Sequence, residues 1–144
     1  MLSALEEAEK ALKLGEIPVG CVIAYKNKII SKAYNMRETG KNAVYHAEIL
    51  AITDACKKIG GWRLDDCDIY VTLEPCMMCA GAILNARLKR LYFGAYDENA
   101  GGVGYIEEKI FQKESGLEIY GGICLDECEQ MLTRFFIDLR KKDN

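Results

Sequence analysis

The sequence predicts a three-layer α/β domain, in which helices cover both faces of a central mixed sheet of about five strands. Two β-rich runs near the N-terminus flank Lys26-Asn27, a pattern typical of a hairpin. Helix-like and strand-like segments then alternate, which favours an α/β fold with helices on both sheet faces. The 144 residues contain no linker, low-complexity run or internal repeat, so we expect residues 1–144 to form one domain.

The first half of the chain predicts a helix, a hairpin and a second helix, in that order. Apolar residues recur at helical spacing over residues 2–12, and Gly15 is a typical stop signal for that helix. The two hairpin strands are expected at 19–25 and 28–34. Residues 45–59 have a helical pattern that ends at a pair of glycines.

The second half predicts three strands and two helices. Pro75 favours a helix start, because the N–H group that proline lacks would have no partner in the first helical turn. A glycine-rich loop is expected at 100–104. The expected elements are strands at 68–73, 88–94 and 117–120, a helix from Pro75 to about residue 85, and a closing helix at 126–141.

Composition predicts a cytoplasmic protein without a membrane segment. Hydrophobic residues make up 50% of the chain and charged residues 28%, which is ordinary for a globular protein. Charged side chains interrupt the apolar residues of the segment 1–13, so no signal peptide is expected. The longest stretch without a charge, 75–86, has 12 residues and is too short to cross a bilayer. The seven cysteines are therefore expected to be reduced, as ligands or core residues.

The net charge of −3 argues against a general nucleic-acid binder, because phosphate binding requires concentrated positive charge. Positive charge is nevertheless concentrated locally. One cluster is Arg87, Lys89 and Arg90, and the other, near the C-terminus, is Arg134, Arg140, Lys141 and Lys142. The C-terminal cluster has two interpretations, complementing a helix dipole or contacting RNA.

The strongest functional signal is a predicted metal site formed by His46, Cys76 and Cys79. His46 is the only histidine of the chain, and the two cysteines follow Pro75 at C-x-x-C spacing. Imidazole and thiolate ligands suit zinc, and three protein ligands leave one tetrahedral position open for water, as in catalytic zinc sites. The positive end of the helix that begins near Cys76 favours thiolates. We therefore predict one zinc ion per chain.

Glu48, two residues after His46, is predicted to carry protons for that water as a general acid and base. Residues two apart on a helix point in different directions, so Glu48 is poorly placed as a fourth ligand. A structural histidine, a redox-active C-x-x-C pair and a Cys76 nucleophile activated by His46 are the alternatives. The nucleophile alternative leaves Glu48, Cys79 and Pro75 without roles.

The chain also resembles a known family through several motifs. His46-Ala47-Glu48 and Pro75-Cys76-Met77-Met78-Cys79 match the signature of zinc deaminases that act on nucleobases. On these motifs the chain resembles the cytidine deaminase superfamily and is most similar to the bacterial tRNA-specific adenosine deaminases, over nearly its whole length. Further matching motifs are Gly15-Glu16-Ile17-Pro18-Val19-Gly20, Trp62-Arg63-Leu64, Tyr70-Val71-Thr72-Leu73-Glu74, Ala80-Gly81-Ala82, Phe93-Gly94-Ala95 with Asp97, Glu127-Cys128 and Phe135-Phe136.

The resemblance implies a cytidine-deaminase-like three-layer α/β/α fold, a zinc cofactor and a homodimer with its active site near the subunit interface. By the same resemblance, His46, Cys76 and Cys79 would hold the zinc ion. Glu48 would be the catalytic general acid and base.

Four residues are predicted as substrate contacts, and the resemblance implies two of them. Asn35 matches an asparagine that hydrogen-bonds the purine, and Asp97 matches an aspartate that contacts the neighbouring ribose of the anticodon loop. Tyr45 and Ala47, which flank the histidine, are expected to line the base pocket. Without the resemblance, Asn35 would be interpreted as a turn residue and Asp97 as a loop carboxylate.

Three features differ from the family pattern. Tyr45 stands where the family commonly has a small residue, and Gly101-Gly102-Val103-Gly104-Tyr105 replaces its Gly-Ala-x-Gly-Ser loop. The segment between Tyr105 and Gly121 is shorter and lacks the family's Asn-His-Arg stretch. These changes fall where deaminases of RNA and deaminases of small molecules differ.

The sequence therefore predicts a zinc-dependent hydrolytic deaminase whose substrate is the wobble adenosine of a tRNA anticodon loop, which it converts to inosine. The first alternative is a deaminase of a free base or nucleoside, because such enzymes share the zinc site. The second alternative is a non-catalytic, zinc-stabilised binding domain. That alternative is disfavoured because a structural zinc site has no use for Glu48.

Overall fold

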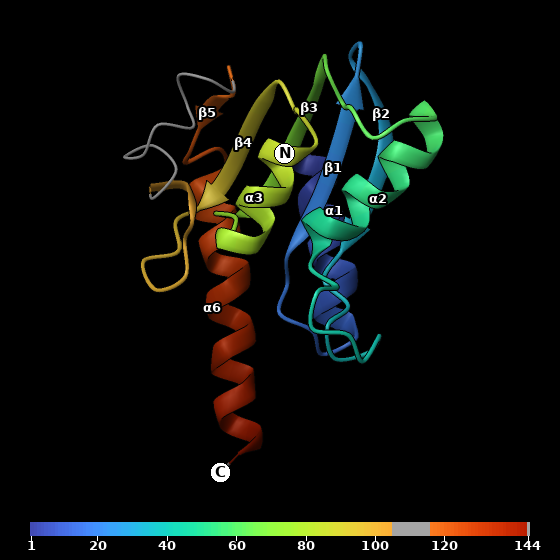
Figure 1. Ribbon diagram of the computed structural model, residues 1–144. Coiled ribbons are helices and arrows are strands. Elements are labelled where there is room, and N and C mark those ends of the chain that lie inside the picture. The colour runs from blue at the N-terminus through green and yellow to red at the C-terminus, as the bar shows by residue number, and fades with distance from the viewer. Residues whose placement is uncertain (105–115, 144) are drawn as a thin grey trace.

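The computed structural model describes residues 1–104 and 116–143, and it confirms the predicted α/β architecture with a five-stranded mixed sheet (Figure 1). The elements are α1 (Leu2–Lys13), β1 (Gly20–Tyr25), β2 (Lys28–Tyr34), α2 (Ala47–Ile59), β3 (Cys67–Leu73), α3 (Met77–Asn85), β4 (Arg90–Ala95), β5 (Glu118–Tyr120) and α6 (Leu125–Lys142). Within the described residues, no helix has both the length and the apolar character needed to cross a membrane.

The strand order of the sheet is β2-β1-β3-β4-β5. β1 runs antiparallel to β2 and β3, whereas β3, β4 and β5 are parallel to one another. Helices α2 and α3 lie side by side on one face, and α1 and α6 cover the other face (Figure 1). The carboxyl ends of β3 and β4 consequently lie at one edge of the sheet, which is where ligands bind in open α/β sheets.

The hairpin between β1 and β2 confirms the prediction made from Lys26-Asn27. Both residues have positive φ angles, 50° and 62°. Two-residue hairpin loops favour this mirror-image turn, because its twist matches the twist of the strands. Asparagine tolerates this conformation better than most residues.

Three alanines let α2 approach the sheet closely. Ala47, Ala51 and Ala55 are fully buried and recur every four residues, so they form one narrow face of the helix. Ser31 of β2 donates a hydrogen bond of 2.9 Å to the carbonyl oxygen of Ala51. This close packing brings the N-terminus of α2, and with it His46, to the sheet.

Two helices begin two residues later than the sequence predicts. Helix α2 begins at Ala47 because Tyr45 is held in a loop, where its N–H bonds to the carbonyl of Asn42. Helix α3 begins at Met77 because Cys76 is held extended by an isolated antiparallel bridge to Gly101. The remaining element boundaries agree with the prediction to within two residues. Of the divergent segment that follows Gly104, residues 105–115 lie outside the described part of the chain.

Candidate active site

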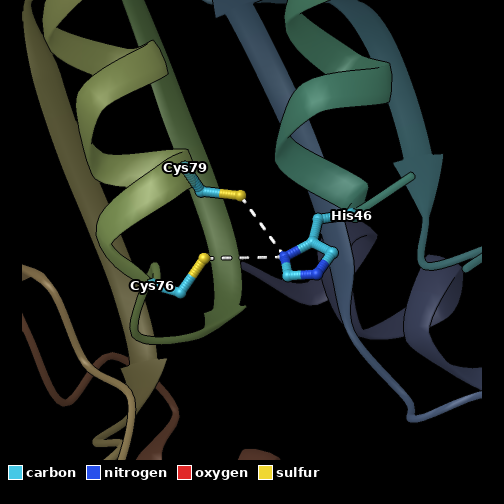
Figure 2. A group of neighbouring side chains, drawn as sticks. All are labelled: His46, Cys76 and Cys79. Atoms are coloured by element: carbon cyan, nitrogen blue, oxygen red, sulfur yellow. Dashed lines mark hydrogen bonds between the residues drawn. The ribbon is translucent and has the colours of Figure 1, made fainter. Parts of the chain in front are cut away.

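The predicted metal ligands are positioned by the N-termini of two neighbouring helices. His46 is the N-cap residue of α2 and Cys76 the N-cap residue of α3, and both have extended backbone conformations. Neither side chain caps its own helix. Both side chains are therefore available to each other, and Cys79 joins them from the first turn of α3 (Figure 2).

The three side chains meet at distances that suit a shared metal ion. Nδ1 of His46 lies 3.6 Å from Sγ of Cys76 and 3.5 Å from Sγ of Cys79 (Figure 2). All three ligand atoms lie within 4.8 Å of one another. Two ligand atoms bound to one tetrahedral zinc ion, roughly 2.0 to 2.3 Å from it, lie about 3.6 Å apart. The donor set and its spacing thus fit zinc.

The thiols of Cys76 and Cys79 are electrostatically coupled. Hydrogen bonds from Cys79 and then from His46 lower the pKa of Cys76 to about 3, whereas the hydrogen bond to Cys76 and burial raise the pKa of Cys79. The interaction between the two thiols therefore shifts their pKa values in opposite directions. The hydrogen bond between His46 and Cys76 raises the pKa of His46. A bound metal ion would displace the protons of the two thiols and of Nδ1 of His46, because metal ligands bind in their deprotonated forms.

Glu48 lies in the first turn of α2 and is only 4% exposed. Burial raises the pKa of its carboxyl group, because burial disfavours the charged form. The thiol of Cys79 lies near enough to affect that pKa. The ligand atoms that cluster within 4.8 Å of one another belong to His46, Cys76 and Cys79, and Glu48 is not among them. The carboxylate is therefore placed beside the candidate metal site rather than within its ligand set.

A pocket of about 220 Å³ opens beside these side chains. Its lining residues come from three regions, namely the loop before β1, the segment between β2 and α2, and the carboxyl ends of β3 and β4. They are Ile17, Val19, Asn35, Arg37, His46, Ala47, Glu48, Leu73, Glu74, Cys76, Asp97 and Ala100. The pocket thus brings together the predicted catalytic glutamate, two of the metal ligands and three of the four predicted substrate contacts.

Asn35 directly follows β2 and is held in a defined orientation. Its Nδ2 donates to the carbonyl oxygen of Ile17 at 3.3 Å, and its Oδ1 accepts from the N–H of Arg37 at 3.2 Å. An asparagine amide has two N–H groups and two acceptor lone pairs, of which these bonds use one each. The amide can therefore recognise a group in the pocket while the protein fixes its orientation.

Asp97 stabilises a tight turn at the end of β4. Its Oδ1 accepts hydrogen bonds of 3.0 Å from the N–H groups of Asn99 and Ala100. Its carbonyl oxygen accepts another from Gly101 at 2.9 Å. Asp97 thus has a local structural role in addition to its place in the pocket lining.

Tyr45 is the one predicted substrate contact that does not line the pocket. Its ring lies over Gly40, where a Cβ atom would come within 2.5 Å of the ring. The N–H of Met36 also bonds to the carbonyl of Tyr45 at 3.0 Å. Tyr45 therefore packs against the turn after β2, and its contact with substrate stays a prediction.

The variant Tyr45→Ala tests whether the ring of Tyr45 contacts the substrate or only packs against the turn after β2. Because the ring lies outside the pocket, we expect kcat/KM to change by less than about threefold. The free energy of unfolding should fall by about 1–3 kcal/mol through lost packing of a half-buried ring. Tyr45→Phe, which keeps the ring, should show neither change. A tenfold or larger change in kcat/KM for Tyr45→Ala would place the ring against the substrate.

Several lining residues had no role predicted from the sequence, among them Arg37, Glu74 and Ala100. Glu74 had a positional signal, since it directly follows a strand and precedes Pro75. Arg37 lies only two residues after Asn35, but its sequence context resembles any exposed loop. The apolar lining residues Ile17 and Val19 could only be identified once the loop before β1 was placed in space.

A three-layer α/β fold that clusters a histidine and two cysteines beside one small pocket, with a buried glutamate in the pocket lining, defines the class of hydrolytic deaminases. The sequence model of the MafB19-like deaminase family matches residues 1–140, and the chain belongs to this family.

Known relatives agree with this class. The chain is 43% identical to the tRNA-specific adenosine deaminase of Bacillus subtilis (strain 168) over 146 residues, which covers 99% of this chain and 89% of that protein. The solved structure of a tRNA:A34 deaminase, studied for A-to-I editing at the wobble position, has a TM-score of 0.82 at 37% identity and covers 92% of this chain and 97% of its own. Guanine deaminase from Bacillus subtilis has a TM-score of 0.62 at 40% identity, over 65% of this chain and 60% of that one.

Proposed function

We propose that the protein is a zinc-dependent enzyme that deaminates adenosine to inosine at the wobble position of tRNA. The observation that carries this proposal is the pocket in which Asn35, Glu48 and Asp97 lie beside His46 and Cys76. The choice of substrate is supported by the tRNA-specific adenosine deaminase of Bacillus subtilis, to which 99% of this chain aligns.

In the proposed reaction, water adds to C6 of adenine and ammonia leaves from the same carbon. His46, Cys76 and Cys79 would hold the zinc ion, which when bound would supply Lewis-acid activation of the water. Glu48 accepts a proton from the water and donates one to the departing amine. Burial raises the pKa of the Glu48 carboxyl group above its usual range, which suits a group that must both accept and release a proton.

The pocket walls supply recognition of the base. Asn35 orients the purine through the hydrogen-bonding capacity that its two structural bonds leave, and Asp97 meets the adjoining sugar at the rim. Ala47 is small and fully buried, so that the base can approach Glu48. A volume of about 220 Å³ suits a single base, which requires that the adenosine be turned out of its stack.

Positive charge on α6 is proposed to contact the RNA backbone. Helix α6 extends beyond the edge of the sheet at which β3 and β4 end (Figure 1). Its last turn carries Arg140, Lys141 and Lys142, all of which are exposed. Arg37 adds a cation in the pocket lining itself. An RNA whose base enters the pocket would find these cations on the same side of the molecule.

The test is a substrate panel of anticodon stem-loop RNA, adenosine, adenine, guanine and cytosine, scored for ammonia release. We expect turnover of the stem-loop, with inosine as the product. Its binding should weaken by roughly a thousandfold or more between 50 and 200 mM salt if six or more phosphates are contacted. The double variant Arg140→Glu/Lys141→Glu should raise KM for RNA and leave the single-turnover rate at saturation unchanged.

The matched control is Lys28→Glu/Lys57→Glu, which makes the same charge change at exposed positions of the β1–β2 hairpin and the far end of α2. This variant should bind RNA within about twofold of the parent. Salt-insensitive turnover of a free base, without inosine in the stem-loop, would exclude the tRNA substrate and retain the deaminase.

The proposal includes a homodimer in the cytoplasm, where tRNA is found. Support for a subunit contact comes from exposed apolar side chains directly beside the candidate metal site. Met77 and Met78 on α3 are 63% and 38% exposed. Exposed apolar groups next to a functional site are common at protein interfaces.

The second candidate function is deamination of a free base. It is favoured by the 40% identity to guanine deaminase from Bacillus subtilis over the matched part of the chain. The pocket volume accommodates a free base as well as a base that is turned out of RNA. The substrate panel separates these two candidates directly.

A further inference from the structure

Two segments that are far apart in the sequence are held together at the edge of the sheet. Glu74 directly follows β3, and Asp97 is the second residue after β4. The main-chain N–H of Glu74 bonds to the carbonyl of Ala95 at 2.8 Å, which continues the pairing of the two strands. Oε2 of Glu74 then accepts a hydrogen bond of 2.9 Å from the main-chain N–H of Asp97.

The segment from Asp97 to Gly102 folds back onto the residues that carry the metal ligands. Gly101 forms an antiparallel bridge with Cys76, and the N–H of Gly102 bonds to the carbonyl of Pro75 at 2.8 Å. This segment therefore lies against the start of α3. Any movement of it would move one wall of the pocket.

The approach of the two segments is too close for a side chain at Gly101. A Cβ atom there would lie 2.5 Å from both Cδ and Oε2 of Glu74, and 2.5 Å from the carbonyl oxygen of Asp97. Real Cβ atoms essentially never show such contacts. The carboxylate of Glu74 thus fills the space that a glycine leaves.

We propose that Glu74 is a positioning residue, which holds the segment 97–102 against the metal-bearing start of α3 and so sets the wall of the pocket formed by Asp97 and Ala100. This inference rests on the proposed function of the pocket, but its central claim concerns the position of a segment. A carboxylate that accepts a main-chain N–H forms a charge-assisted bond, which is stronger than a bond between neutral groups.

An alternative role for Glu74 is catalytic, because its side chain also lines the pocket. The two roles differ in what glutamine can replace. A glutamine oxygen can accept the N–H of Asp97, but an amide cannot carry a proton for the reaction. A positioning role therefore predicts that Glu74→Gln is nearly normal, whereas a catalytic role predicts that it is as impaired as Glu74→Ala.

The experiment compares Glu74→Ala and Glu74→Gln with the parent by hydrogen exchange, zinc content and kinetics. In Glu74→Ala, the amides of the segment 97–102 should exchange roughly ten- to a hundredfold faster. KM for the stem-loop should rise roughly tenfold, kcat should stay within about threefold, and zinc should stay at one per chain. Glu74→Gln should restore most of the protection and of KM. Glu98→Ala, which removes an exposed carboxylate from the same segment, should match the parent.

A double-mutant cycle adds a second test of the contact. Gly101→Ala alone should loosen the same amides, because its Cβ displaces the segment from Glu74. In the Glu74→Ala background, Gly101→Ala should have a smaller effect, because one of its two clashes is then absent. Additive effects of the two substitutions would contradict direct contact.

Two results would overturn the proposal. The first is unchanged hydrogen exchange of the segment 97–102 in a folded Glu74→Ala protein, as judged by its thermal unfolding. The second is a Glu74→Gln variant whose kcat falls as far as that of Glu74→Ala. Hydrogen exchange requires no substrate, so it tests the position of the segment even if the protein does not deaminate tRNA.

Discussion

Replacing Glu48 by glutamine should lower kcat by roughly a hundredfold or more while the protein keeps its zinc and its fold. The glutamine side chain has nearly the same volume as that of glutamate, so the buried site stays filled. It cannot accept the proton of the attacking water or return it to the amine, and a general acid and base contributes roughly 10²–10⁴-fold to rate. The measurement is single-turnover deamination at saturating substrate, beside zinc analysis of the same sample.

Glu7→Gln is the matched control for this variant. Glu7 is 3% exposed, close to the 4% of Glu48, but it lies on α1 against the opposite face of the sheet. Its substitution should leave kcat within about twofold of the parent. If Glu48→Gln loses both zinc and turnover, Glu48 is a metal ligand; if it turns over at the parent rate, another group moves the protons.

The second large effect is expected from Cys79→Ser, which should remove the zinc ion, the activity and part of the stability. A hydroxyl is a far weaker zinc ligand than a thiolate, and only two good ligands would remain. A ligand present at a thousand times its Kd stabilises a protein by about 4 kcal/mol. For a chain of this size, losing that amount lowers Tm by roughly 10 °C. Chelation of the parent protein should produce a similar shift.

Cys67→Ser controls for the loss of a buried thiol. Cys67 and Cys79 are both fully buried, but Cys67 lies in β3 and is not part of the ligand group. Its substitution should lower Tm through lost packing and should leave one zinc per chain. A Cys79→Ser protein that is fully active without zinc would refute the metal site.

Much of the fold could be predicted from local sequence signals. Glycines and Pro75 mark where helices end and begin, and Lys26-Asn27 marks the hairpin. These signals act through the conformational preferences of one or a few residues, so they do not depend on distant contacts. The predicted starts of α2 and α3 were wrong by two residues. A loop hydrogen bond of Tyr45 delays the start of α2, and the bridge between Cys76 and Gly101 delays the start of α3.

The predicted site residues depend on tertiary structure to different degrees. The chemistry of His46, Cys76 and Cys79 is evident from their types and from the C-x-x-C spacing. The distances of 3.5–3.6 Å from Nδ1 of His46 to the two sulfur atoms require that the N-termini of α2 and α3 meet at the sheet edge. Proximity in sequence did not predict the position of Tyr45, since it adjoins His46 in the chain yet packs against Gly40.

The sequence by itself determined which groups are available for chemistry and which helices would present them, because helix starts and ligand types are local properties. Only the tertiary structure decided which of those groups share one pocket. Residues 35, 48, 74 and 97 approach one another through the pairing of β1, β3 and β4 and through the alanine face that draws α2 onto the sheet. Such approaches depend on the packing of whole elements, which no short segment encodes. Glu74 became significant for the same reason, since its partner Asp97 is 23 residues away in the chain and 2.9 Å away in space.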